Sequence, residues 1–302
     1  MRIGVVVLTY NRAAMLGEAL DTVRAQTRPA DAVVVVDNGS TDDTVVLVQA
    51  RQPDWPELQL VAQRNVGQLG GWISGLAAVP DVDVVTFLDS DDWYQPDFLA
   101  HVESEFSASP GAEICFFSYQ YAGGYDDAVV AHGDGWMEGD FLRAVFTRLW
   151  RGSPGSMIAI RRHTAEMLFA AVSHPALLRT RTDDLFVVLG AAYGLRRRTS
   201  SHVGVRYRIH DSNLYGNRRI TPWEEEMRHR NSIVRVLEPS RQLVRSMTPD
   251  DRRAFFEREL DDIVRSGGDT WTVVDELLRN LPVEDTERGE LSLLADHRLR
   301  AG

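Results

Sequence analysis

The sequence predicts an α/β protein with a mostly parallel sheet flanked by helices and a helical extension at its C-terminal end. Short apolar runs alternate with segments of helical periodicity through the first half of the chain. Each of these runs ends in polar residues, and the pattern turns helical and highly charged after residue 222. Alternation of strands and helices favours a parallel sheet with crossover helices. We therefore expect a sheet domain over residues 1–215 and a helical extension over residues 216–302.

The strands of the first half are predicted from apolar runs bounded by turn and cap residues. Residues 3–8 form a nearly continuous apolar run, as expected for a strand covered on both faces. Asn11 can cap the helix that follows, and Pro29 lies shortly beyond its end. The same reading predicts strands at 32–36, 58–62 and 84–88, with helices between them.

The second half carries weaker signals of the same kind. Strands are predicted at 114–119, 157–160 and 203–208, with helices at 165–172 and from Thr182 onward. The glycine- and acid-rich stretch 123–139 indicates an irregular loop or a hairpin. The pattern from Pro222 to residue 302 predicts three or four helices.

Composition limits the classes of function. The 302 residues are 44% hydrophobic and 25% charged, which is typical of a globular protein, and the net charge of −11 argues against a nucleic-acid partner. Cys115, the single cysteine, lies in an apolar run and is expected to be a buried strand thiol. The chain starts almost at once with a strand and has no run of 18 apolar residues, so we expect a cytoplasmic protein, with peripheral membrane contact left open.

The strand at 84–88 runs directly into the acids Asp89, Asp91 and Asp92. Carboxylates are rarely buried without a partner, so these acids mark the exposed end of the strand, where ligands bind in open α/β sheets. Mg²⁺ and Mn²⁺ prefer oxygen ligands and commonly combine carboxylates with phosphate oxygens. The stretch therefore predicts a divalent-cation site for a diphosphate.

Four motifs in order, at residues 7–12, 36–42, 64–67 and 88–92, resemble the family 2 glycosyltransferases of the GT-A fold. The resemblance covers roughly the first 215 residues, most strongly up to Trp93. It implies a GT-A, Rossmann-related sheet and an inverting transferase that uses a nucleotide-diphosphate sugar with Mn²⁺ or Mg²⁺. The acids Asp89, Asp91 and Asp92 occupy the family's DxD position.

The resemblance also implies which residues meet the donor. Asp37 would accept a hydrogen bond from the base, and independently of the family a carboxylate there can accept the uracil imide hydrogen, which favours a UDP- or dTDP-type donor. Glycines near the ligand would let the backbone approach it, although tight helix packing is the alternative. The full set expected to bind the nucleotide sugar is Thr9, Tyr10, Asn11, Arg12, Asp37, Asn38, Asn65, Gly67, Gly71, Ser90 and Asp91.

An inverting transfer needs a base for the acceptor hydroxyl, and a carboxylate suffices. The family places an acid pair at the start of a later helix, and Thr182-Asp183-Asp184 resembles it, so we expect Asp184 to be the base, with Asp183 as the reserve. Helix capping is the competing role. The segment ending at His210 resembles one whose histidine completes the metal site or contacts the diphosphate; an ordinary surface histidine is the alternative.

The predicted function is transfer of a hexosyl or deoxyhexosyl group to an acceptor hydroxyl that the sequence does not identify. The alternatives are a non-catalytic nucleotide-sugar-binding protein and a sugar-1-phosphate nucleotidylyltransferase. A dinucleotide-binding oxidoreductase is disfavoured because no G-x-G-x-x-G follows the first strand. A homodimer through the C-terminal helices is a further expectation.

Overall fold

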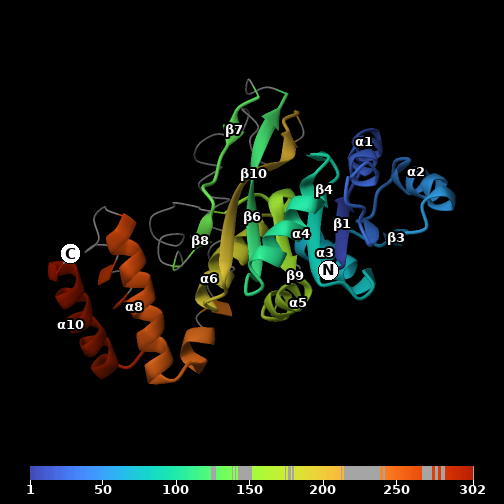
Figure 1. The fold of residues 1–302 in the computed structure, drawn as a ribbon. Helices are drawn as coiled ribbons and strands as arrows, with labels where there is room; N and C mark the ends of the chain where they lie inside the picture. Colours follow the sequence, from blue (N-terminus) through green and yellow to red (C-terminus); the bar gives the residue numbers. More distant parts are fainter. Residues whose placement is uncertain are drawn as a thin grey trace.

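A twisted sheet forms the centre of the molecule in the computed structural model (Figure 1). The structure describes residues 1–123, 127–137, 139, 141, 152–173, 175, 178, 180–211, 213, 239–240, 242–266, 274–275, 278–279 and 283–301. Within these residues the strands follow the order β3-β2-β1-β4-β9-β6-β10-β5, with β7 on β6 and β8 on β10. The strands are β1 (Ile3–Thr9), β2 (Ala32–Asp37), β3 (Leu58–Ala62), β4 (Val84–Asp89), β5 (Trp93–Tyr94), β6 (Ile114–Ala122), β7 (Val129–Val130), β8 (Gly135–Met137), β9 (Ile158–Arg161) and β10 (Arg197–Arg208).

The first four long strands are parallel and make the half of the sheet that the sequence predicts best. β1 pairs with β2 and β4, and β2 pairs with β3, all in parallel. β9 runs antiparallel between β4 and β6. β10 then pairs in parallel with β6, so the sheet is mixed but mostly parallel among its long strands.

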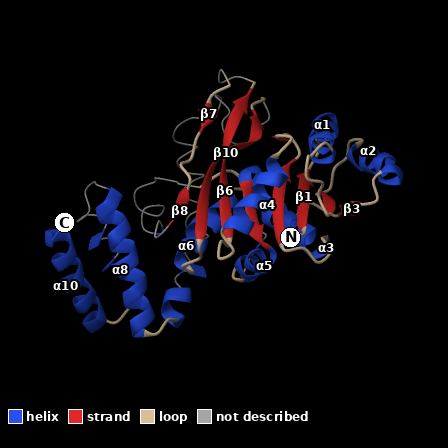
Figure 2. Cartoon of the chain, viewed as in Figure 1, coloured by secondary structure: helices blue, strands red, loops and turns tan. Residues whose placement is uncertain are grey.

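Helices cover both faces of this sheet (Figure 2). Alternate residues of β1 enter different cores: Val6 packs in one cluster, and Val5 and Val7 pack in the other, as strand geometry requires. One face is covered by α1 (Ala13–Arg24), α2 (Thr44–Arg51) and α4 (Phe98–Ala108). The other face is covered by α3 (Gly67–Ala78), α5 (Arg162–Ala170), a π-helical stretch (Leu185–Leu189) and α6 (Gly190–Ala192).

The C-terminal region is helical where it is described. α8 (Pro249–Ser266) and α10 (Asp285–Ala301) lie at one end of the molecule, beside the segment that carries α6 (Figure 1). Phe255, Phe256 and Leu260 of α8 belong to the same hydrophobic cluster as α3 and the π-helical stretch. The expected boundary between residues 215 and 216 falls outside the described residues.

The predicted fold class is confirmed, and local differences from the sequence-based expectations are small. The stretch 123–139, expected to be a loop or a hairpin, contributes the short strands β7 and β8 where it is described. Cys115 is a buried strand thiol, as expected. Among the residues that the structure describes, no helix combines the length and the apolar character needed to cross a bilayer.

Candidate active site

The parallel strands bring the predicted site residues to one edge of the sheet. Thr9 at the end of β1 is paired with Asp37 at the end of β2, and the preceding Leu8 is paired with Asp89 at the end of β4. Neighbouring strands lie about 4.8 Å apart, so Asp37 and Asp89 stand roughly 10 Å from each other across β1. This edge is where open α/β sheets bind their ligands.

The loops after β1 and β2 hold each other in place. Asn11 has a φ of 52°, its backbone N–H donates to Ser40 Oγ at 2.8 Å, and its side-chain oxygen accepts from the backbone of Thr41 at 2.7 Å. Asparagine tolerates this left-handed backbone better than most residues do. The Asn11 side chain therefore has a structural role in joining the two loops, whatever it contributes to a ligand.

Asp37 is buried, with 3% of its surface exposed. The backbone N–H of Ser40 donates to it, at 3.0 Å to Oδ1 and 3.3 Å to Oδ2. Nearby, the Thr9 hydroxyl is buried and has no hydrogen-bond partner among the described residues, while the Tyr10 side chain stays 48% exposed. A buried carboxylate and an unsatisfied hydroxyl at the edge are groups that a polar ligand could engage.

The loop after β3 is fastened to β2 by Asn38. The Asn38 side chain donates to Gly67 O and accepts from Val66 N, both at 3.1 Å. Asn65 accepts from the backbone N–H of Gly67 at 3.1 Å, and Gly67 has a φ of 83°, which favours glycine. These residues shape the turn into α3 and lie at the same edge as Asp37.

Gly71 has a packing reason for lacking a side chain. It is buried in α3, and a Cβ there would come within 2.4 Å of Leu8 Cδ1 on β1. The glycine thus lets α3 approach the strand closely. Of the two reasons for a glycine weighed from the sequence, the packing one has direct geometric support.

Asp91 is the acid of the DxD stretch that faces cationic partners. Its Oδ2 lies 3.0 Å from His210 Nε2 and 3.6 Å from an Arg12 nitrogen. Burial alone would raise the pKa of Asp91, but the hydrogen bond from His210 and the charge of Arg12 outweigh it and hold the pKa below its usual value. The structure therefore brings Arg12, Asp91 and His210 together.

Asp89 lies in the opposite electrostatic situation. Burial and then the charges of Asp91 and Asp183 raise its pKa to about 7. The side-chain amide of Gln68 donates to Asp89, while the Gln68 oxygen accepts from the backbone of Thr182 at 3.1 Å. Gln68 thereby links the end of β4 to the segment that carries the second acid pair.

Both carboxylate oxygens of Asp92 accept hydrogen bonds from other groups of the protein. It is 1% exposed, its Oδ2 accepts from Ser156 Oγ at 2.6 Å and its Oδ1 accepts from the backbone N–H of Arg208 at 3.0 Å. The Ser156 hydroxyl also accepts from the backbone N–H of Asp89 at 3.0 Å. Burial, then Asp91 and Asp89, raise the pKa of Asp92 well above its usual value. Ser90 is 4% exposed, and its backbone N–H donates to Leu8 O, so it belongs to the strand end.

The two acids at the later helix differ sharply in their surroundings. Asp184 is fully buried and receives two hydrogen bonds from Arg181, at 2.9 and 3.0 Å. Asp183 remains partly exposed, and burial together with the charge of Asp184 raises its pKa to about 7. Asp183 also acts electrostatically on Asp89, which places it at the acid edge.

Three residues that sequence reasoning missed complete these contacts: Gln68, Ser156 and Arg181. Each lies in a different segment from the acid it supports or has an unusual backbone, and Arg181 has a φ of 57°. The polar Gln68 among the small residues that open α3 was the one visible signal.

The fold is that of the GT-A class, which the solved structures described below share. The model of glycosyl transferase family 2 matches residues 4–169, more than half of the chain, and the chain belongs to this family. It is therefore a glycosyltransferase, as the motifs predict.

The chain is also similar in sequence to individual glycosyltransferases. The chain is 28% identical to an uncharacterised glycosyltransferase of Nostoc over 77% of its own length and 72% of the relative's. It is 30% identical to the validoxylamine A glucosyltransferase of Streptomyces hygroscopicus, over 39% of this chain and 29% of that one.

Solved structures share the fold. TarS of S. aureus in complex with UDP-GlcNAc matches with a TM-score of 0.60 and 16% identity, over 99% of this chain and 88% of that chain. A mannosyltransferase of Pyrobaculum calidifontis in complex with GDP-Man and Mn²⁺ matches with a TM-score of 0.53 and 19% identity, over 99% and 85%.

Proposed function

We propose that this glycosyltransferase is a metal-dependent, inverting enzyme that moves a sugar from a UDP- or dTDP-type donor to an acceptor hydroxyl. The observation that carries the proposal is the meeting of two acids, Asp89 and Asp183, from segments far apart in the sequence, each with a pKa raised to about 7. Perturbed acids gathered at a ligand-binding edge are typical of catalytic sites.

The acids at the end of β4 fit a divalent cation. Asp89 and Asp91 repel each other, and Arg12 and His210 pair with Asp91. A cation between the two acids would relieve the repulsion that raises the pKa of Asp89. We therefore propose Asp89 and Asp91 as ligands of Mn²⁺ or Mg²⁺, with His210 as a third ligand or a contact to the diphosphate.

Asp92, which the sequence included among the metal ligands, is assigned a supporting role instead. Its two carboxylate oxygens already accept hydrogen bonds from Ser156 and Arg208, which tie β4 to two later segments. When bound, the metal would supply charge neutralisation for the leaving diphosphate.

We assign the base to Asp183 in place of Asp184. A base must reach the acceptor hydroxyl and be able to take up a proton near neutral pH. Asp183 is partly exposed and has a pKa near 7, whereas Asp184 is fully buried in a two-bond pair with Arg181. Asp184 then fixes the turn at Arg181 and, through its charge, raises the pKa of its neighbour.

The donor nucleotide is proposed to lie across β1, from Asp37 to the acids of β4. Asp37 would accept the imide hydrogen of uracil or thymine. TarS was solved with UDP-GlcNAc and the Pyrobaculum enzyme with GDP-Man, and guanine also offers N–H donors to a carboxylate. A panel of donors must therefore decide which nucleobase the enzyme prefers.

The test is a panel of UDP-, dTDP- and GDP-sugars, each assayed with Mn²⁺, with Mg²⁺ and with chelator, for thermal stabilisation and for release of nucleoside diphosphate. We expect metal-dependent turnover with a UDP- or dTDP-sugar and its loss in Asp91→Asn. Turnover with GDP-sugars alone would overturn the assignment of uracil or thymine as the nucleobase of the donor. Stabilisation by a donor without any turnover, even with added glycan acceptors, would favour a nucleotide-sugar-binding protein.

A further inference from the structure

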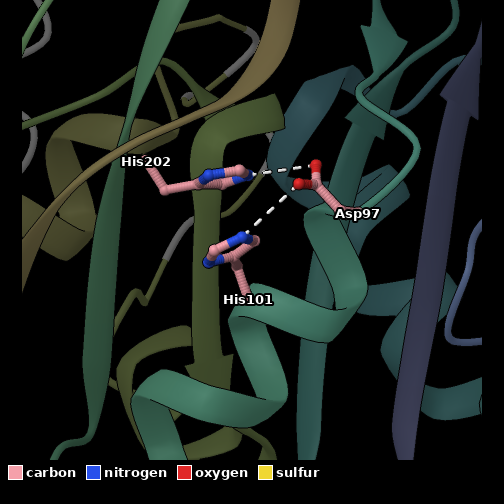
Figure 3. A group of neighbouring side chains, drawn as sticks. All are labelled: Asp97, His101 and His202. Atoms are coloured by element: carbon pink, nitrogen blue, oxygen red, sulfur yellow. Dashed lines mark ion pairs between the residues drawn. The ribbon is translucent and has the colours of Figure 1, made fainter.

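A group of three side chains lies outside the site described above, between α4 and β10 (Figure 3). Asp97 is the residue before α4, His101 lies in the first turn of α4, and His202 comes from β10. His101 Nε2 lies 3.4 Å from Asp97 Oδ2, and His202 Nε2 lies 3.4 Å from Asp97 Oδ1. One ligand atom from each residue lies within 4.8 Å of the other two.

The carboxylate of Asp97 is not used for helix capping. Asp97 is the residue before α4, a position where aspartate commonly bonds the free N–H groups of the first turn. Its side chain makes no such bond here and faces the two imidazoles instead.

His202 is held in place by an irregularity of its strand. The pairing of β10 with β6 shifts between Ser200 and Val203, and this bulge contains His202. Bulges re-aim side chains, often at functional positions. The Nε2 atom of His202 is buried and makes no hydrogen bond of good geometry among the described residues, although it lies near Asp97. A buried ring nitrogen that faces a carboxylate without a well-aligned hydrogen bond is available to a further ligand.

We propose that Asp97, His101 and His202 form a binding site for a transition-metal ion of the Zn²⁺ type, separate from the catalytic acids. Two imidazole nitrogens and one carboxylate suit Zn²⁺ and its neighbours in the transition series, whereas Mg²⁺ prefers an all-oxygen set. With metal–ligand bonds of about 2.0 Å, the ligands of a tetrahedral ion stand about 3.3 Å apart. Each imidazole Nε2 lies 3.4 Å from one of the two carboxylate oxygens of Asp97, which is close to that separation, and one ligand atom from each residue lies within 4.8 Å of the other two.

The stacking and the exposure of the histidines agree with this role. Histidine binds metals through the neutral imidazole. The two rings are stacked with centroids 3.5 Å apart, and the His101 side chain is 45% exposed. His101 is therefore free to tilt so that both nitrogens converge on the ion, while solvent supplies the fourth ligand.

An ion at this position would join two segments that flank the active site. Asp97 follows Gln95 by two residues and His202 precedes Gly204 by two residues, and the backbone N–H of Gln95 donates to Gly204 O. β10 continues from His202 to Arg208, whose backbone donates to Asp92. The ion would thus fasten the start of α4 to the strand that leads into the acid edge.

The test is a Zn²⁺ titration of chelator-treated full-length protein in an Asp91→Asn background, which weakens ion binding at the catalytic acids. We expect one tightly bound Zn²⁺, and a visible absorption spectrum of nitrogen-ligated Co²⁺ when Co²⁺ is used instead. Changes in residues around metal ligands alone cost 10–100-fold in affinity, so replacing a ligand by His202→Gln should cost at least about 100-fold. Excess Mg²⁺ should not displace the Zn²⁺.

Two further variants control the test. His101→Gln changes the more exposed ligand and should fold while also losing Zn²⁺, and His163→Gln alters a histidine on α5 and should bind Zn²⁺ as the parent does. Metal-free melting temperatures verify that each variant is folded. No Zn²⁺ bound by the parent, or equal binding by the parent and both ligand variants, would overturn the proposal and leave the cluster as a histidine–aspartate ion pair.

Discussion

Asp183 and Asp184 are adjacent, but their environments differ, and we propose different roles for them. Substituting each in turn should therefore give different effects. Asp183→Asn should lower the turnover number by about 10²–10⁴-fold, the usual contribution of a general base, with donor affinity nearly unchanged and a melting temperature at neutral pH no lower than the parent's, because the pKa of Asp183 is raised to about 7. Asp184→Asn breaks the charge-assisted pair with Arg181 and should destabilise the fold by about 1–3 kcal/mol.

Kinetics and thermal unfolding of the two variants decide between them. If Asp183→Asn is folded and keeps full transfer activity, while Asp184→Asn is folded and has lost transfer activity, the general base is Asp184.

The raised pKa of Asp89 implies that, without metal, the ionised Asp89 carboxylate destabilises the folded protein at neutral pH. A carboxylate whose folded-state pKa lies near 7, above the unfolded value of 3.8, binds more protons in the native state. Stability therefore falls as the pH rises from about 4 to about 7. Asp89→Asn removes this penalty, so in chelator the variant should melt above the parent, by a margin that grows between pH 5 and pH 8.

Thermal unfolding at several pH values measures this margin, and the exposed substitution Asp81→Asn is the control. Mn²⁺ should raise the melting temperature of the parent at pH 8 and leave that of Asp89→Asn almost unchanged. A margin that shrinks as the pH rises would contradict the proposed crowding of acids.

At the scale of elements, two helical glycines predict opposite effects of the same substitution. Gly75 lies in α3, where a Cβ would come within 2.3 Å of Val6 and 3.0 Å of Val36, whereas Gly289 in α10 has no atom within 4 Å of that position among the described residues. Gly75→Ala should cost about 1–3 kcal/mol by overpacking. Gly289→Ala should stabilise by about 0.5–1 kcal/mol because alanine favours the helix.

Denaturant unfolding of the two variants measures both signs. Equal effects would mean that α3 can move away from β1 without cost.

The same elements show why the sequence predicts part of the site well. The end of a buried strand followed by acids is a local signal, and β1, β2 and β4 needed only parallel pairing to bring Asp37 and Asp89 to one edge. The support for those acids is non-local: Ser156 contacts Asp92 from 64 positions away, and Gln68 meets Thr182 from 114 positions away. No local pattern encodes such pairs, and the choice between Asp183 and Asp184 depends on Arg181, whose left-handed backbone turns it toward the second acid.

On the scale of the whole molecule, the described C-terminal helices are continuous with the catalytic body. Phe141 and Phe255 meet with ring centroids 5.7 Å apart, and Arg258 donates to Ala191 O at 3.4 Å. The homodimer through these helices stays a prediction, and Leu293 is exposed on α10. Light scattering at several concentrations, for the parent and Leu293→Ser, tests the dimer.

The shared core predicts that the molecule unfolds as one unit. Phe256 is fully buried in the cluster that also contains Trp72 and Phe186, so Phe256→Ala should cost about 3–5 kcal/mol. Because the cluster is continuous, calorimetry should show one transition at a lower temperature, by about 2–4 °C for each kcal/mol. Leu293→Ala, at a side chain 73% exposed, should leave that transition in place. Two transitions, with the helical one alone shifted by Phe256→Ala, would instead make residues 216–302 an independent domain attached to the transferase.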